Sequence, residues 1–136
     1  MGVELRQTGR AFTDVRVRRA LNYCTNREAL VTLLSRLAEP AAGVYHKTDP
    51  YFGHPKEQYT HNPAKAKELL KEAGYGPDKP VAAKVTISTS GSGQMLPLVM
   101  NEYVQQNLKK CNFDISFEVV DWGTMLAAMR NPPTGA

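Results

Sequence analysis

The sequence FTDVRVRRALNYCTNREALVTLLSRL at residues 12–37 predicts two short amphipathic helices that follow one another directly. In the first, Val17, Ala20, Leu21 and Cys24 recur at the spacing that puts side chains on one face of a helix. The second helix shows the same spacing in four leucines: Leu30, Leu33, Leu34 and Leu37. The two apolar stripes therefore predict a helical pair that lies on a hydrophobic core.

Polar residues predict where these two helices begin. Thr13 is expected to be the N-cap of the first helix, and Asp14 to place a carboxylate in its first turn, where the helix dipole favours negative charge. Asn26 is expected to cap the second helix. The arginines of this stretch fall largely outside the apolar stripes, and we expect them to be surface charges: Arg16, Arg18, Arg19 and Arg27.

A third helix is predicted over residues 62–75, NPAKAKELLKEAGY. Asn62 can cap it, Pro63 suits the first helical position, and Gly74 suits the left-handed position after the last turn. The buried stripe is expected to consist of Ala66, Leu69, Leu70 and Ala73.

Residues 81–119 have the pattern of a strand, a helix and a second strand. Apolar residues alternate with polar or small ones over residues 81–88 and again over residues 113–119. Between them a long helix is expected to open near Gln94 and to bury Leu96, Val99, Met100, Tyr103, Val104, Leu108 and Cys111. Two strands joined in this way are parallel. The fold class is therefore α/β, with several helices packed on a small sheet that contains a parallel βαβ unit, and Asp121 is expected to cap a final helix beginning at Trp122.

The turn after the first strand is the best candidate binding site. It follows a strand and precedes a helix, where open α/β sheets bind ligands and where free N–H groups attract an anion. The residues expected to line it are Ser88, Thr89, Ser90, Gly91, Ser92 and Gln94. The alternative interpretation is a flexible strand-to-helix turn without a ligand.

No recognisable catalytic or cofactor motif is present. Leu96 occupies the third glycine position of a dinucleotide-binding fingerprint, and no Gly-Lys-Ser/Thr completes a phosphate-binding loop. The three histidines are not spaced as metal ligands on a regular element: His46, His54 and His61. We therefore expect no metal, no cofactor and no catalysis, and a small α/β enzyme is kept only as an alternative.

An irregular stretch between residues 39 and 62 carries four aromatic residues: Tyr45, Tyr51, Phe52 and Tyr59. We expect these rings mainly to pin the loop to the domain, because an aromatic side chain buries a large apolar area. The alternative is an interaction module in which residues 45–59 dock a protein partner.

The charge distribution argues against one class of partner, nucleic acid. The 136 residues carry a net charge of +4, but basic and acidic residues are interleaved without an aromatic stacking pattern, so we expect no nucleic-acid partner. The N-terminus lacks the basic and apolar regions of a signal peptide. A cytoplasmic protein and an internal piece of an exported protein both have that appearance.

The two cysteines leave two interpretations open. Cys24 lies on an apolar helix face and Cys111 where a helix meets a strand, so we favour buried free thiols, which behave as small hydrophobic groups. A disulfide in an oxidising compartment stays the alternative, because sequence does not show whether the two Cα atoms lie within about 7 Å.

The segments at residues 12–37 and 62–75 together resemble hallmarks of the extracellular solute-binding proteins of ABC importers, in the family that binds peptides and nickel complexes. The second hallmark reads Asp/Asn-Pro-x-Lys-Ala-x-x-Leu-Leu-x-x-Ala-Gly-Tyr, and Asn112 stands where that family usually has glycine before the second strand. The resemblance covers about residues 11–130.

The resemblance implies a periplasmic or lipid-anchored surface receptor that closes two lobes on a peptide or similar solute and delivers it to a membrane permease. Residues 1–136 would be a single α/β domain forming part of the second lobe, with a helical part at 11–75 and the βαβ unit plus a helix at 80–130. Because the rest of such a protein normally covers one face, exposed apolar surface could make the isolated chain a homodimer.

Overall fold

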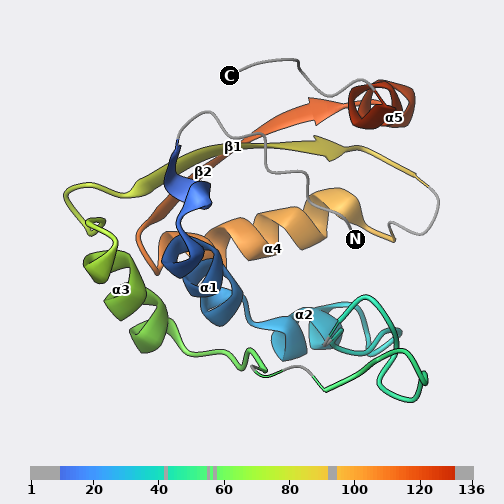
Figure 1. The fold of residues 1–136 in the computed structure, drawn as a ribbon. Coiled ribbons are helices and arrows are strands. Elements are labelled where there is room, and N and C mark those ends of the chain that lie inside the picture. The colour runs from blue at the N-terminus through green and yellow to red at the C-terminus, as the bar shows by residue number, and fades with distance from the viewer. Residues whose placement is uncertain (1–9, 42, 55, 57, 92–94, 131–136) are drawn as a thin grey trace.

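The computed structural model describes residues 10–41, 43–54, 56, 58–91 and 95–130, and it has the predicted α/β class (Figure 1). Its elements in chain order are η1 (Arg10–Thr13), α1 (Val15–Cys24), α2 (Arg27–Leu33), α3 (Pro63–Glu72), β1 (Val81–Ser88), α4 (Pro97–Lys109), β2 (Phe113–Val120) and α5 (Trp122–Arg130). Helices α1, α3 and α4 lie on one side of the two strands, and α5 follows the end of β2. Among the described residues, no helix combines the length and apolar character that crossing a membrane requires.

The two strands form a parallel pair, which confirms the predicted βαβ unit. Their register runs from Val81 opposite Phe113 to Ser88 opposite Val120, with α4 as the connection. In its first half β1 alternates between buried and exposed residues, whereas residues 85–88 are all buried. Both strands therefore end at the same edge of the molecule, and β1 enters that edge from the interior.

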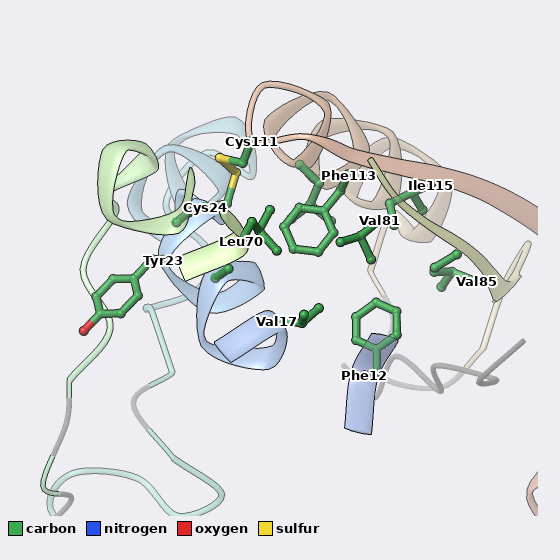
Figure 2. Packing of buried hydrophobic residues seen from close by; sticks show 14 of the residues in the cluster. Phe12, Val17, Tyr23, Cys24, Leu70, Val81, Val85, Cys111, Phe113 and Ile115 are labelled. Atoms are coloured by element: carbon green, nitrogen blue, oxygen red, sulfur yellow. A yellow bond between two sulfur atoms is a disulfide. The ribbon is translucent and has the colours of Figure 1, made fainter. Parts of the chain in front are cut away.

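A single hydrophobic cluster joins the helices to the sheet (Figure 2). Leu70 of α3 and Val17 of α1 are fully buried, as are Val81 at the start of β1 and Cys24 at the end of α1. Phe113 at the start of β2 is 2% exposed. The cluster thus contains residues from both the helical part and the βαβ unit.

Three of the four predicted helix caps are confirmed, at Asn26, Asn62 and Asp121. Asn26 Oδ1 accepts from Ala29 N at 3.0 Å, and Asn62 Oδ1 accepts from Lys65 N at 3.0 Å. The N-cap of α1 is Asp14 rather than Thr13, because Thr13 belongs to the preceding 3₁₀ turn and helix α1 begins after it.

Arg16 and Arg27 are more than solvated surface charges. The Arg16 guanidinium bonds the Asp14 carboxylate and also donates to Glu72 O at the end of α3, 2.7 Å away. The hydrogen bond between the Arg16 side chain and the Asp14 carboxylate holds the pKa of Asp14 below its usual value. Arg27 is partly buried and donates to Asn22 Oδ1 at 2.5 Å.

The predicted apolar stripe of the second helix is wrong beyond its first turns. Leu34 is buried, but Leu33 is 47% exposed and Leu37 is 78% exposed. Helix α2 ends at Leu33 because Ser35 and Arg36 adopt positive φ values of 54° and 59°, which a helix does not tolerate. Leu37 therefore leaves the face that the periodicity assigned to it.

The long helix also begins later than predicted. It starts at Pro97, so Leu96 precedes it and is 56% exposed, and Val99 is 46% exposed. Gln94, where the helix was expected to open, lies outside the described residues. The rest of the predicted inner face is partly or fully buried, and Asn101 and Asn107 are buried with it.

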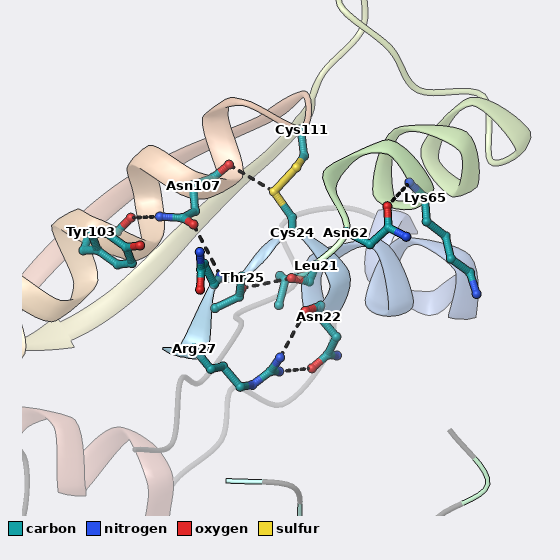
Figure 3. Close-up of a disulfide and its surroundings, with 11 residues drawn as sticks. Leu21, Asn22, Cys24, Thr25, Arg27, Asn62, Lys65, Tyr103, Asn107 and Cys111 are labelled. Carbon is teal, nitrogen blue, oxygen red and sulfur yellow. Dashed lines mark hydrogen bonds between the residues drawn. A yellow bond between two sulfur atoms is a disulfide. The ribbon is translucent and has the colours of Figure 1, made fainter. Parts of the chain in front are cut away.

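The favoured interpretation of the cysteines is wrong: Cys24 and Cys111 form a disulfide (Figure 3). Their Cα atoms are 6.3 Å apart although 87 positions separate them in sequence, and both residues are fully buried. Asn107 adds a second link, since its Oδ1 accepts from Asn26 N and its Nδ2 donates to Tyr103 O. These contacts join the α1–α2 junction to the end of α4.

Replacing Asn112 with alanine is expected to cost about 1 kcal/mol of unfolding free energy, whereas glycine should cost nothing. Asn112 has a φ of 67° in the turn before β2, a left-handed conformation in which a Cβ is crowded and glycine is not. Urea unfolding of Asn112→Ala and Asn112→Gly measures the difference. Equal stability of the two variants would contradict the account of this turn.

Candidate functional site

The edge at which both strands end carries the candidate site. β1 runs into Thr89, Ser90 and Gly91, while β2 runs into Asp121 and the first turn of α5. Thr89 N donates to the carbonyl oxygen of Val120 at 3.3 Å, so the turn after β1 begins as an extension of the sheet. The end of β1 and the start of α5 therefore lie close together (Figure 1).

The predicted site residues differ in how accessible they are. Thr89 and Ser90 are exposed and place two hydroxyl groups at this edge. Ser88 is only 1% exposed and closes the buried end of β1. Ser92 and Gln94 lie outside the described residues.

Sequence reasoning missed Trp122 as a neighbour of this turn. A Cβ built on Gly91 would lie 2.7 Å from Cε3 of the Trp122 ring, so the Gly91 backbone rests directly on the indole. A signal was available: Trp122 opens the helix that follows the second strand, and parallel strands end at a common edge.

The Asp121 carboxylate holds Trp122 at the start of α5. Asp121 Oδ1 accepts from Thr124 N at 2.9 Å, and Oδ2 accepts from the Thr124 hydroxyl, which confirms the predicted cap. These hydrogen bonds, chiefly that from the hydroxyl, hold the pKa of Asp121 below its usual value of 3.8.

Acid is expected to loosen the first turn of α5. Because the pKa of Asp121 is lower in the folded than in the unfolded chain, its stabilising contribution is complete above about pH 4 and is lost as pH falls through the folded pKa. Trp122 emission followed from pH 6 to pH 2 should show this loss. In Asp121→Asn, which caps without titrating, the corresponding transition should be absent; its persistence unchanged would show that another group is responsible.

Away from this edge, a hollow with a volume of about 640 Å³ lies between α1, α2 and the irregular loop. Its lining includes Asn26, Arg27, Tyr59 and His61. Burial lowers the pKa of the Arg27 guanidinium. Within the described part of the chain, no group of three or more His, Cys, Asp or Glu residues is arranged to hold a metal ion.

The aromatic loop only partly follows its prediction. Tyr59 packs edge-to-face on Tyr23 with ring centroids 5.0 Å apart, so it does pin the loop to α1. Tyr45 and Tyr51 pack on each other at 6.0 Å but are 52% and 79% exposed. These two rings do not anchor the loop to the core.

A family model and individual relatives both place this chain among bacterial solute-binding proteins. Residues 2–134 match the family described as "Bacterial extracellular solute-binding proteins, family 5 Middle". The glutathione-binding protein GsiB of Salmonella choleraesuis (strain SC-B67) is 32% identical over 129 residues, which are 94% of this chain and 24% of GsiB. The chain thus spans about a quarter of the length of this curated relative.

Two solved structures share the fold. The periplasmic binding protein DppA from Helicobacter pylori, in complex with the peptide STSA, is 26% identical with a TM-score of 0.74, over 93% of this chain and 23% of DppA. NikA from Staphylococcus aureus, in complex with Ni(L-His)2, is 25% identical with a TM-score of 0.72, over 88% of this chain and 25% of NikA.

The fold is therefore that of part of a lobe in a periplasmic-type solute-binding protein. The chain belongs to family 5 of the bacterial extracellular solute-binding proteins, as its sequence hallmarks indicated.

Proposed function

We propose that this chain is part of the substrate-binding component of an ABC importer, and that its strand-end edge forms one wall of the solute site. The observation that carries the proposal is the family match over residues 2–134. Residues 1–136 would be part of one lobe, which closes with a second lobe on the solute and presents it to a membrane permease. The protein would bind its solute without catalysing a reaction.

The proposed solute is a peptide or a similarly small derivative of amino acids. The relatives are described as binding glutathione, a peptide and a nickel–histidine complex, all of which contain amino-acid carboxylates. The exposed hydroxyls of Thr89 and Ser90 are suitable donors to such a carboxylate. We keep Ser88, Gly91, Ser92 and Gln94 in the proposed site as predicted from sequence.

The proposed location is the periplasm or the outer cell surface. The Cys24–Cys111 disulfide supports it, because disulfides persist in oxidising compartments and are rare in the cytosol. The family match favours solute binding over the two alternatives, a partner-docking loop at 45–59 and a small enzyme.

Solute binding by the full gene product, measured calorimetrically with dipeptides, tripeptides and glutathione, tests this function. Ser90→Trp should weaken the affinity about tenfold or more, because the larger side chain occupies the proposed wall. Ala64→Trp is the matched control, since Ala64 is exposed and belongs to α3. That helix lies away from the edge where the strands end (Figure 1). Unchanged affinity in Ser90→Trp would contradict the site, and a gene product that binds none of these solutes would contradict the function.

A further inference from the structure

The backbone at Gly91 approaches the Trp122 ring more closely than any other residue type would allow. A Cβ on Gly91 would lie 2.7, 2.9 and 3.1 Å from Cε3, Cδ2 and Cζ3 of Trp122, all atoms of the six-membered ring. Two of these distances are shorter than the 3.0 Å that real Cβ atoms respect. The contact therefore requires a residue without a side chain.

The conformation of Gly91 gives an independent reason for glycine. Its φ is +154°, a value that residues with a side chain rarely adopt. Among the other described glycines, Gly53 and Gly74 have positive φ but no atom within 4 Å of a built Cβ. Gly91 is thus the described glycine that combines a positive φ with a close side-chain neighbour.

Trp122 is itself held in place from two directions. The Asp121 cap fixes the first turn of α5, and Met125, one turn further on, is 4% exposed and anchors the helix to the core. Met125 N also donates to Asp121 O at 3.1 Å. The helical turn that carries the ring is therefore fixed at the edge where the strands end.

The turn after β1 is attached to this edge at both of its described ends. Thr89 is hydrogen-bonded to Val120 at the end of β2, and Gly91 rests on Trp122. Ser90 lies between these two attachments and is exposed. The backbone on both sides of Ser90 is thus held, by a hydrogen bond at Thr89 and by the indole at Gly91.

We infer that Trp122 is a positioning residue: its indole supports the backbone at Gly91, a contact that we call the seat, and so holds the backbone that presents Thr89 and Ser90 to a solute. The consequence for affinity rests on the proposed function, whereas the seat itself does not. A turn that is already ordered before binding loses less conformational entropy when the solute arrives, so the seat raises affinity without touching the solute.

The seat is testable in this chain alone, because Trp122 is its only tryptophan. In the NMR spectrum of the unliganded chain, nuclear Overhauser effects are expected between Gly91 Hα and the protons on Cε3 and Cζ3 of the indole. Their absence in a folded sample would overturn the inference without any substitution being made.

Fluorescence gives a second readout with a matched control. Gly91→Ala should push the turn away from the indole and uncover it, which should shift its emission maximum and increase its quenching by acrylamide. Gly76→Ala should leave both unchanged, because Gly76 has neither a positive φ nor an atom within 4 Å of a built Cβ. Identical emission and quenching in Gly91→Ala and the unsubstituted chain would contradict the seat.

The effect on affinity is tested in the full gene product with the tightest-binding peptide of the calorimetric panel. Trp122→Ala should weaken binding about tenfold, and Trp122→Phe, which keeps a flat ring, should restore most of it. Full affinity in Trp122→Ala would overturn the positioning role while leaving the proposed function intact. A gene product that binds no peptide would instead contradict the proposed function, with the NMR contacts still reporting on the seat.

Discussion

Leu70→Ala is expected to lower the free energy of unfolding by about 3 kcal/mol. Among the described residues, Leu70 is the largest of the fully buried side chains, and it lies in the cluster that joins α3 to α1 and the sheet. Truncation removes its buried methyl groups and leaves a cavity, because closely packed neighbours relax only partly. Urea unfolding followed by far-UV circular dichroism measures the loss.

Leu37→Ala provides the matched control for this substitution. Leu37 is 78% exposed, so the same chemical change should alter stability by less than about 0.5 kcal/mol. A loss of similar size in both variants would mean that the helical periodicity at residues 30–37 was a better guide than the structure, and that the described end of α2 is wrong.

Removing the disulfide by Cys24→Ala with Cys111→Ala is expected to destabilise the chain by about 4.5 kcal/mol. The bridge closes a loop of 87 residues, and in the chain-entropy account a loop of that size restricts the unfolded state by roughly this amount. Alanine is chosen rather than serine because both positions are fully buried, and a serine hydroxyl there would lack a hydrogen-bond partner. Such a loss is a large part of the about 5–15 kcal/mol by which a typical domain is stable.

The reducing agent dithiothreitol supplies the control for the disulfide prediction. It should lower the stability of the unsubstituted chain toward that of the double variant, while leaving the variant itself unchanged. Equal unfolding free energies for the oxidised chain and the double variant would contradict a stabilising role for the bridge.

The features that sequence predicted well are local ones. The caps at Asn26 and Asn62 depend on hydrogen bonds within three residues, and the alternation in residues 81–84 depends on which face of a strand is buried. The parallel pairing of β1 and β2 followed from the helix between them. In each case the residues that determine the structure lie close together in the sequence, so the pattern can be recognised before the fold is known.

Helix ends were less predictable because the residues that end them are ordinary. Ser35 and Arg36 adopt positive φ values although neither is glycine or asparagine, so their residue types do not predict the end of the helix. The periodicity of the leucines continued past the helix, so Leu37 was assigned to a face that no longer exists there. Apolar spacing alone does not show where the backbone turns.

The disulfide and the Trp122 contact were missed because both are non-local. Cys24 and Cys111 meet only when α1 packs against the end of α4, and Gly91 meets Trp122 only when two strands end at one edge. The sequence predicted that common edge, and with it the position of Thr89 and Ser90. It did not predict what lies beneath the turn.

Hydrogen–deuterium exchange of the full gene product, with and without a bound peptide, tests the central claim most directly. The account predicts that peptide slows exchange of the Ser90 and Gly91 amides, at the edge where β1 and β2 end, while amides on the outer face of α3 exchange as before. Slowed exchange elsewhere in the protein, with Ser90 and Gly91 unaffected, would contradict the placement of the solute site on this edge.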